Sequence, residues 1–290
     1  MNPFERVSII GVGLLGGSLA KVLRKLGLAK SIVGYGRNKA NLNGAKNLNI
    51  IDDVAPDIQS AAKDADLIVF CSPVQTIAQL AMEMSPHIKP GCLVTDVGST
   101  KETLISEIEK FVPEGISFIG AHPIAGGEMS GFRLSSDTLF DDAHCIITPT
   151  DKTDPEALKR AIELWKTIGM QVSIMDAKEH DFIFGAVSHL PHVLIFALMN
   201  TLGGLKSENH NQITSFSGAG LRDITRIAAS EPAMWRDICV SNKDSILYFL
   251  DLFQETLSHL RSGIEQENGT LLTRQFEIAN QHRLKLISKT

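Results

Sequence analysis

The sequence predicts a doubly wound α/β domain with a mostly parallel sheet, followed by an all-helical domain. Short β-branched runs alternate with helical patterns over the first 175 residues, which is typical of a parallel sheet covered on both faces. A glycine-rich turn follows the first run. Beyond about residue 175 only helical periodicity remains. We therefore expect two domains, residues 1–175 and 176–290, as a chain of this length also favours.

The expected strands are β-branched runs that end at turn signals, and the expected helices space apolar residues three or four apart. The strands cover residues 7–10, 31–34, 67–70, 93–97, 118–119, 144–148 and 171–174. Helices of the first domain cover residues 18–26, 76–85 and 155–167. Helices of the second domain cover residues 178–202, 221–229, 232–262 and 269–286. No strand is expected in the second domain.

Composition limits the partners of this chain. A net charge of −5 gives no reason to expect nucleic acid or an anionic membrane surface. The longest apolar stretch, residues 186–202, is interrupted by His189, Pro191 and His192. It falls short of the roughly 20 apolar residues of a membrane span, so we expect a buried helix. The start of the chain lacks the pattern of a signal peptide. Four scattered cysteines favour buried free thiols in a reducing compartment, and we expect a cytoplasmic protein.

The glycine-rich turn reads GVGLLG at residues 11–16 and matches the G-x-G-x-x-G pattern of a Rossmann dinucleotide site. In such a turn Gly11 permits the tight bend, Gly13 lets the backbone approach a pyrophosphate, and Gly16 lets helix and strand pack closely. The N–H groups at the helix start, including those of Leu14 and Leu15, then face the phosphates. A turn without a ligand is the alternative, but the position between a strand and a helix favours a dinucleotide.

Two further strand ends are expected beside that dinucleotide. Gly36 stands where NAD-preferring sites usually have an acid for the adenine-ribose hydroxyls, and Arg37 follows it. An arginine either contacts a 2′-phosphate, which favours NADP, or faces solvent or the adenine. The expected cofactor is therefore NAD or NADP, without a choice between them. Ser72 and Pro73 follow another strand, and we expect them near the nicotinamide ribose or in an ordinary turn.

Four further motifs carry a resemblance to a known family. They read TDVGSTK at residues 95–101, GAHPIAGGEMSG at 120–131, SHLPH at 188–192 and LRDITRIA at 221–228. Together with the glycine turn they resemble, in order and over nearly the whole chain, the signatures of prephenate/arogenate dehydrogenases. The resemblance implies a Rossmann domain followed by a helical domain that builds an intertwined homodimer. It also implies oxidative decarboxylation of prephenate, or of arogenate, with NAD(P)+ in tyrosine biosynthesis.

The resemblance assigns the chemistry to two residues. His122 is expected on a flexible polar loop, where a neutral imidazole with an ordinary pKa accepts the substrate's hydroxyl proton. Its alternative is a histidine bonded to a backbone carbonyl. Ser99 matches a family serine that hydrogen-bonds the same hydroxyl. The spacing from Ser99 to Glu102 also fits a capping box, in which Ser99 simply starts a helix.

Other residues are expected to bind the substrate. Arg226 offers a carboxylate a bidentate contact, across the dimer interface if the dimer is intertwined. Asp223, three residues earlier, either orients Arg226 or forms a surface pair worth little. Glu128 is expected at the mouth of the site or paired with a cation, with a solvated carboxylate as its alternative.

Ser188 and His192 lie four residues apart and are expected to share one face of an apolar helix, in contact with substrate. The alternative is a core histidine bonded to a backbone carbonyl, which fits His189 better than His192. No metal site is expected, because these histidines lack a third ligand of suitable spacing.

Two other classes are alternatives: a β-hydroxyacid or imine reductase, which shares the plan of a Rossmann domain followed by helices, and a non-catalytic dinucleotide sensor, which needs only the glycine turn. Neither gives the His122 segment a role. The joint presence of His122, Ser99 and Arg226 favours the dehydrogenase.

Overall fold

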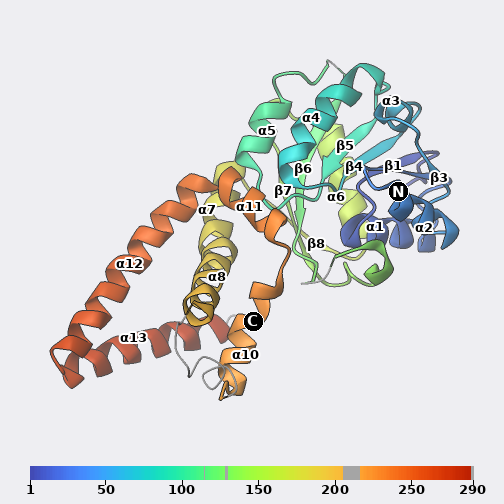
Figure 1. Ribbon diagram of the computed structural model, residues 1–290. Coiled ribbons are helices and arrows are strands. Elements are labelled where there is room, and N and C mark those ends of the chain that lie inside the picture. Colours follow the sequence, from blue (N-terminus) through green and yellow to red (C-terminus); the bar gives the residue numbers. More distant parts are fainter. Residues whose placement is uncertain (114, 128–129, 205–215, 289–290) are drawn as a thin grey trace. The chain divides into compact units, whose positions relative to one another are not determined.

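The computed structural model describes residues 1–113, 115–127, 130–204 and 216–288 (Figure 1). The chain divides into two compact units, Met1–Lys243 and Asp244–Thr290, and each is described by itself. The domain boundary expected between residues 175 and 176 stays a prediction.

The first unit contains an eight-stranded sheet in the order β3-β2-β1-β4-β5-β6-β7-β8. The strands are β1 (Val7–Ile10), β2 (Ile32–Tyr35), β3 (Asp53–Val54), β4 (Leu67–Phe70), β5 (Leu93–Asp96), β6 (Ser117–Pro123), β7 (His144–Thr148) and β8 (Gln171–Ile174). Neighbouring strands are parallel except β6 and β7. This confirms the predicted α/β sheet. Strand order reverses between β1 and β4, and open α/β sheets bind ligands beyond the carboxyl ends of the strands at such a point.

Helices cover both faces of this sheet (Figure 1). One face carries α1 (Leu14–Lys25), α2 (Lys39–Asn47) and α6 (Pro155–Thr167), and the other carries α3 (Ile58–Ala62), α4 (Val74–Met84) and α5 (Glu102–Ile108). Successive strand residues face opposite sides, so Ile9 enters the core under α1 and Ile10 the core under α3 and α4. Helix α6 buries Leu164 and Trp165, and its Leu158 and Ile162 are partly buried against the same core.

Helices alone follow β8 in the part of the chain that the structure describes. They are α7 (Ala177–Phe184), a π-helical turn (Gly185–His189), α8 (Leu190–Gly203), α10 (Ala219–Thr225), a 3-10 turn (Arg226–Ala229), α11 (Pro232–Ser241), α12 (Lys243–Glu265) and α13 (Gly269–Ile287). The expectation of one helix over residues 232–262 is wrong. It breaks at Asn242, whose φ of −113° and ψ of 38° are not helical.

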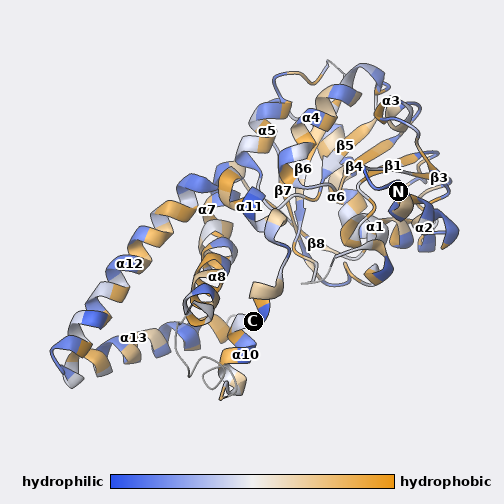
Figure 2. Ribbon diagram, viewed as in Figure 1, coloured by the Kyte–Doolittle hydropathy of each residue, from blue (hydrophilic) through white to orange (hydrophobic). Residues whose placement is uncertain are grey.

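Helix α8 is apolar without being buried. The continuous helical segment Ala177–Gly203 has 27 residues. Its most apolar window has a mean hydropathy of 1.9, and only 11% of that window is buried. Figure 2 shows the apolar colouring along α8. By length and composition alone it is long enough to cross a membrane, contrary to expectation, because α7 and the π-helical turn extend the helix. None of the residues of α8 is fully buried, so the expectation of a buried helix is wrong for the single chain.

Candidate active site

The glycine turn joins β1 to α1 at the switch point of the sheet. Gly11 has a φ of +105°, and a Cβ there would lie 2.7 Å from the backbone of Cys71. A Cβ on Gly16 would lie 2.2 Å from the carbonyl oxygen of Gly11, so this contact between α1 and β1 requires glycine. A Cβ on Gly13 would meet nothing within 4 Å, and no described side chain caps α1. The turn therefore leaves open space before the free N–H groups of a helix start, as a pyrophosphate requires.

The other two predicted cofactor segments follow β2 and β4, the strands on either side of β1, at the same edge of the sheet. Gly36 comes directly after β2, is half-buried, and a Cβ there would meet nothing within 4 Å. Arg37 is exposed. Ser72 follows β4, and a Cβ on Gly11 would lie 2.8 Å from its backbone nitrogen. Pro73 is exposed at the start of α4. The structure thus brings Ser72 and the glycine turn together.

His122 lies in strand β6 and not on a flexible loop, so that expectation is wrong. Strand β6 extends past the end of β5 and pairs with β7, which places His122 opposite Ile146. The residue is 9% exposed. Burial disfavours the charged imidazolium and lowers the pKa of His122 well below its ordinary value, and the positive charge of Lys101, or of His180 when that ring is protonated, lowers the pKa further. The expectation of an ordinary pKa is therefore also wrong.

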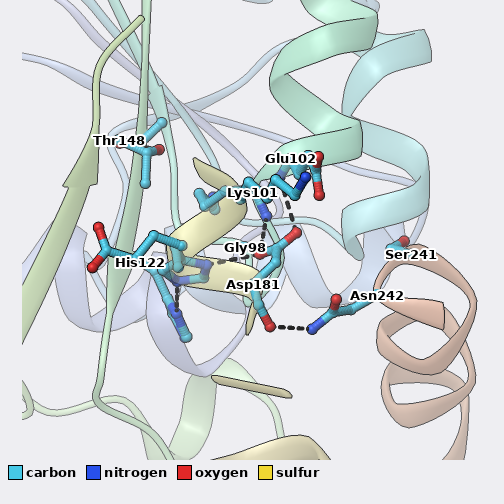
Figure 3. Close-up of polar contacts among 12 residues, drawn as sticks. Gly98, Lys101, Glu102, His122, Thr148, Asp181, Ser241 and Asn242 are labelled. Atoms are coloured by element: carbon cyan, nitrogen blue, oxygen red, sulfur yellow. Dashed lines mark hydrogen bonds and ion pairs between the residues drawn. The ribbon is translucent and has the colours of Figure 1, made fainter. Parts of the chain in front are cut away.

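A buried ion pair holds the backbone next to His122. The Lys101 ammonium contacts the Asp96 carboxylate, and both side chains are fully buried. Asp96 Oδ1 accepts the N–H of Ala121 at 3.0 Å, and Lys101 Nζ donates to the carbonyl of Ala121 at 2.9 Å. Gly98 N–H donates to Asp96 Oδ2 at 2.7 Å (Figure 3). The side chains of Asp96 and Lys101 therefore bond to the backbone of β6 at the point where the backbone of β5 no longer pairs with it.

A second histidine and a carboxylate, both on α7, extend from His122. The Nδ1 of His122 lies 2.8 Å from the Nε2 of His180. The Nδ1 of His180 lies 2.7 Å from Oδ1 of Asp181. We call these three side chains the His122 chain. Both residues on α7 are buried, and neither lies in a motif from which we predicted site residues.

Asp181, and not Ser99, caps α5. The Asp181 carboxylate accepts the backbone N–H groups of Lys101 and Glu102 at 2.8 Å and 2.9 Å (Figure 3). A capping box would require the Ser99 hydroxyl to accept the N–H of Glu102. That alternative is wrong, so the hydroxyl of half-buried Ser99 is not committed to starting the helix.

Asn242 connects the His122 chain to the rest of the helical part of the first unit. Its amide donates to the carbonyl of Asp181 at 2.6 Å (Figure 3). The same amide nitrogen lies 3.0 Å from Nδ1 of His189. These bonds accompany the end of α11 at Asn242. His189 is thus satisfied by a side chain and not by the backbone carbonyl that we considered. Burial lowers the pKa of His189 to about 4.

His192, and not His189, makes the hydrogen bond to a backbone carbonyl that we considered for these histidines. Its Nδ1 donates to the carbonyl of Ser188 at 2.8 Å, and its ring stacks on Trp235 with centroids 3.7 Å apart. The ring centroid of His189 lies 6.1 Å from that of the same indole. This arrangement leaves Nε2 as the ring nitrogen of His192 available to a ligand.

The remaining predicted substrate residues do not belong to the His122 chain. Arg226 opens the 3-10 turn after α10 and is exposed, as is Asp223 on α10. Glu128 lies outside the described residues.

Lowering the pH from about 6.5 to about 4 is expected to destabilise the fold, because the pKa values of buried His122, His180 and His189 are all lowered. The unfolded chain binds more protons in this range, so the free energy of unfolding falls as the pH falls. For His189, a change from 6.5 to about 4 corresponds to about 3 kcal/mol over the whole range. Urea unfolding at pH 7 and pH 5 measures the part of this loss that falls above pH 5, about 2 kcal/mol for His189. A His189→Gln variant should lose less stability than the unaltered protein between these pH values. An equal loss in both proteins would contradict the claim that the lowered pKa of His189 contributes to the pH dependence.

Family models match consecutive parts of the chain. The model described as prephenate dehydrogenase, nucleotide-binding domain, matches residues 19–174. The model described as prephenate dehydrogenase, dimerization domain, matches residues 176–278.

Individual proteins are similar over nearly the whole chain. A cyclohexadienyl dehydrogenase of Zymomonas mobilis is 33% identical over 286 residues, which cover 99% of this chain and 97% of the relative. A prephenate dehydrogenase of Bacillus subtilis is 35% identical over 281 residues, or 96% and 75% of the two chains. The crystal structure of prephenate dehydrogenase from Aquifex aeolicus with hydroxyphenyl propionate and NAD+ matches with a TM-score of 0.90 at 36% identity, covering 97% of this chain and 98% of that one.

Proposed function

This chain belongs to the prephenate dehydrogenase family, and we propose that it converts prephenate and NAD(P)+ to 4-hydroxyphenylpyruvate, carbon dioxide and NAD(P)H. The observation that carries the proposal is the buried His122, which stands at the carboxyl end of β6 with a prearranged hydrogen-bond partner. Carboxyl ends of parallel strands share one edge of a sheet, and the glycine turn lies at that edge. A reductase or a dinucleotide sensor would have no use for this histidine.

Arogenate is the alternative substrate, since it differs from prephenate only by an amino group in place of the keto group. The relative from Zymomonas mobilis is named a cyclohexadienyl dehydrogenase. We therefore propose prephenate as the substrate and arogenate as its alternative.

The chemistry requires a proton acceptor at the ring hydroxyl. A bound nicotinamide supplies the acceptor for the hydride that leaves the hydroxyl-bearing carbon. His122 takes the hydroxyl proton through Nε2 as the carbon is oxidised, and Ser99 hydrogen-bonds the same hydroxyl. Loss of the ring carboxylate as carbon dioxide returns an electron pair to the ring. The resulting phenolate oxygen then recovers its proton from His122, so the enzyme ends the cycle unchanged.

The glycine turn fits the pyrophosphate of this cofactor, because a side chain at Gly13 would occupy space that the structure leaves open. We assign the cofactor to the backbone of Gly11, Gly13, Leu14, Leu15 and Gly16, with Gly36 and Arg37 at the adenine ribose and Ser72 and Pro73 at the nicotinamide ribose.

Substitution Gly36→Asp is expected to shift the cofactor preference toward NAD+. The carboxylate fits sterically, because a Cβ at Gly36 meets nothing within 4 Å. It would accept bonds from ribose hydroxyls and repel a 2′-phosphate. We expect the ratio of kcat/KM for NAD+ over NADP+ to rise at least about tenfold, since like charges brought together at an interface cost more than the 1.4 kcal/mol of a tenfold change. A Gly36→Asn variant controls for side-chain size, and an unchanged ratio in Gly36→Asp would place the choice elsewhere.

We assign the substrate carboxylates and side chain to the helical residues. Arg226 binds a carboxylate, and Asp223 orients Arg226. Ser188 and His192, whose ring stacks on Trp235, contact the substrate. Glu128 stays a proposal from sequence alone.

Substitution Arg226→Ala is expected to raise KM for the acid substrate roughly 10- to 100-fold, the equivalent of the 1.5–3 kcal/mol of a hydrogen bond to a charged group. The effect on kcat should be smaller, because the carboxylate contact is also made in the ground state. Steady-state kinetics measures both constants. Arg226→Lys should recover little, since lysine lacks the bidentate geometry. An unaltered KM in Arg226→Ala would remove Arg226 from the substrate site.

We propose that residues 176–290 form the dimerisation and substrate half and that the functional unit is a homodimer. The matching dimerization-domain model supports this, and so does the apolar surface that the helices expose, since large exposed patches mark interfaces. Large exposed apolar side chains in this half include Val187, Met199, Leu247, Leu252, Leu257 and Phe276. In α7 and the following turn, buried His180, Asp181 and His189 favour packing within a protein over a membrane span.

We also propose that the protein is cytoplasmic, without nucleic-acid or membrane partners. The four cysteines are free, with Cys92 and Cys145 buried; Cys71 and Cys239 are only partly buried, which corrects the expectation that all are buried. Free thiols agree with a reducing compartment.

The direct test is the absorbance of reduced cofactor after the purified protein is mixed with prephenate or arogenate, each with NAD+ and NADP+. We expect prephenate to reduce NAD+, NADP+ or both cofactors. No reduction in any of the four mixtures, by protein that is folded and dimeric, would overturn the proposed function.

A further inference from the structure

The His122 chain contains two residues whose roles the proposed reaction leaves open. We infer that Asp181 and His180 fix His122 in the tautomer whose Nε2 carries no proton, so that this nitrogen is ready to accept the substrate's proton. His180 and Asp181 are then positioning residues that act through His122. This inference rests on the proposed function for its use, but the tautomer itself is a property of the protein without substrate.

The tautomer follows from the hydrogen bonds in sequence. The Asp181 carboxylate can only accept, and it already accepts the N–H groups of Lys101 and Glu102. The His180 nitrogen that faces it, Nδ1 at 2.7 Å, must therefore carry a proton. In a neutral imidazole the other nitrogen then has none, so Nε2 of His180 is an acceptor. His122 must donate to it from Nδ1, at 2.8 Å, which leaves Nε2 of His122 unprotonated.

The neutrality of both rings supports this assignment. Burial lowers the pKa of His180 as well as that of His122, so neither ring is an imidazolium at neutral pH. If His180 were charged it would donate to Nδ1 of His122, and Nε2 of His122 would hold the proton.

The same chain favours His122 once it has taken the substrate's proton. The imidazolium keeps its Nδ1–H bond to His180, and His180 keeps its bond to the Asp181 carboxylate. Positive charge on Lys101 opposes protonation, although Asp96 pairs with that ammonium. His189 also faces the site and is neutral, because its pKa is lowered to about 4. His180 and Asp181 are therefore the groups placed to offset the cost of a buried charge on His122.

A purely structural role for His180 would be packing. Its ring lies 4.5 Å from that of Phe184, which also contacts His122 at 4.8 Å. A metal bridge between the two histidines does not fit, since nitrogens 2.8 Å apart are closer than two ligands of one zinc ion. Packing and tautomer control predict different results for a side chain that keeps the acceptor but loses the ring.

The tautomer is measured directly by long-range 1H–15N correlation spectra of the complete, 15N-histidine-labelled protein. A His122→Asn variant identifies the signals of His122. We expect His122 protonated at Nδ1 and free at Nε2 near pH 7. A proton on Nε2 of His122 would overturn the inference, whatever the protein's substrate is. Failure of the proposed function would instead leave this spectrum unchanged and show as an absence of turnover.

Kinetics with three variants tests the consequence. His180→Leu removes the acceptor, and we expect kcat to fall at least about 100-fold, with KM changed little, because general-base catalysis and its tautomer control contribute roughly 10²–10⁴-fold. His180→Gln keeps an amide oxygen for the Nδ1–H of His122, and it should retain most of kcat. Phe184→Leu removes the ring contact alone and should lower kcat far less than His180→Leu.

Equal losses in His180→Leu and His180→Gln, or unchanged kcat in His180→Leu, would overturn the inference. If His180→Leu does not fold, the His180→Gln variant and the spectrum of the native protein still decide it.

Discussion

Replacing His122 with asparagine is expected to lower kcat by roughly 10²–10⁴-fold, the usual contribution of a general base. Asparagine fits the volume of the buried site at β6 and can still donate to His180, but it has no nitrogen that can take the hydroxyl proton. Cofactor and substrate affinities should change little, because the contact matters most as charge develops on the substrate oxygen. Steady-state kinetics gives kcat, and fluorescence titration of the cofactor gives its Kd.

The matched control for this variant is His144→Asn. His144 is exposed at the start of β7, the strand paired with β6, and its replacement should leave kcat unchanged. An unchanged kcat in His122→Asn would remove His122 from the chemistry. A loss of cofactor binding equal to the loss of kcat would instead indicate a structural defect.

Substitution Lys101→Met is expected to destabilise the fold by about 3–5 kcal/mol, the cost of leaving one partner of a buried ion pair without its counter-charge. Lys101 and Asp96 are both fully buried, and together they satisfy the backbone of Ala121 next to His122. The expected decrease in Tm is roughly 10 °C. Because the ion pair holds strand β6, the variant should also lose turnover at temperatures where it is folded.

Two controls separate this effect from a general loss of positive charge. Lys30→Met removes an exposed ion pair to Glu5 at 2.6 Å and should cost less than about 1 kcal/mol. The double variant Lys101→Met with Asp96→Asn removes both buried charges and should recover part of the lost stability. If Lys101→Met and Lys30→Met had the same Tm, the buried pair would not support β6.

The fold could be predicted from sequence because strand-length apolar runs alternate with helices. Strand β3 was missed, since Asp53 and Val54 are too few to form such a run. The break between α11 and α12 was missed because the helical periodicity continues through Asn242. That residue leaves the helix while bonding to Asp181 and His189, which are distant in sequence.

The candidate site could be predicted only where short motifs carry it. His122, Ser99 and the glycines lie in such motifs, whereas His180 and Asp181 gain their positions from tertiary contacts across 58 and 80 residues. One signal was available: adjacent His180 and Asp181 stand near the start of the long apolar helix Ala177–Gly203, where polar residues are costly unless paired. Asp96 and Lys101 lay within a quoted motif, but their partnership through Ala121 depends on where β5 ends.

The most direct test of the central claim measures carbon dioxide and reduced cofactor together, with prephenate labelled by 13C in the ring carboxylate. Our account predicts one labelled carbon dioxide for each reduced cofactor, with 4-hydroxyphenylpyruvate as the other product, and a parallel loss of both signals in His122→Asn. Cofactor reduction without release of the label, or release of the label without cofactor reduction, would contradict the claim that this site couples oxidation of the ring to its decarboxylation.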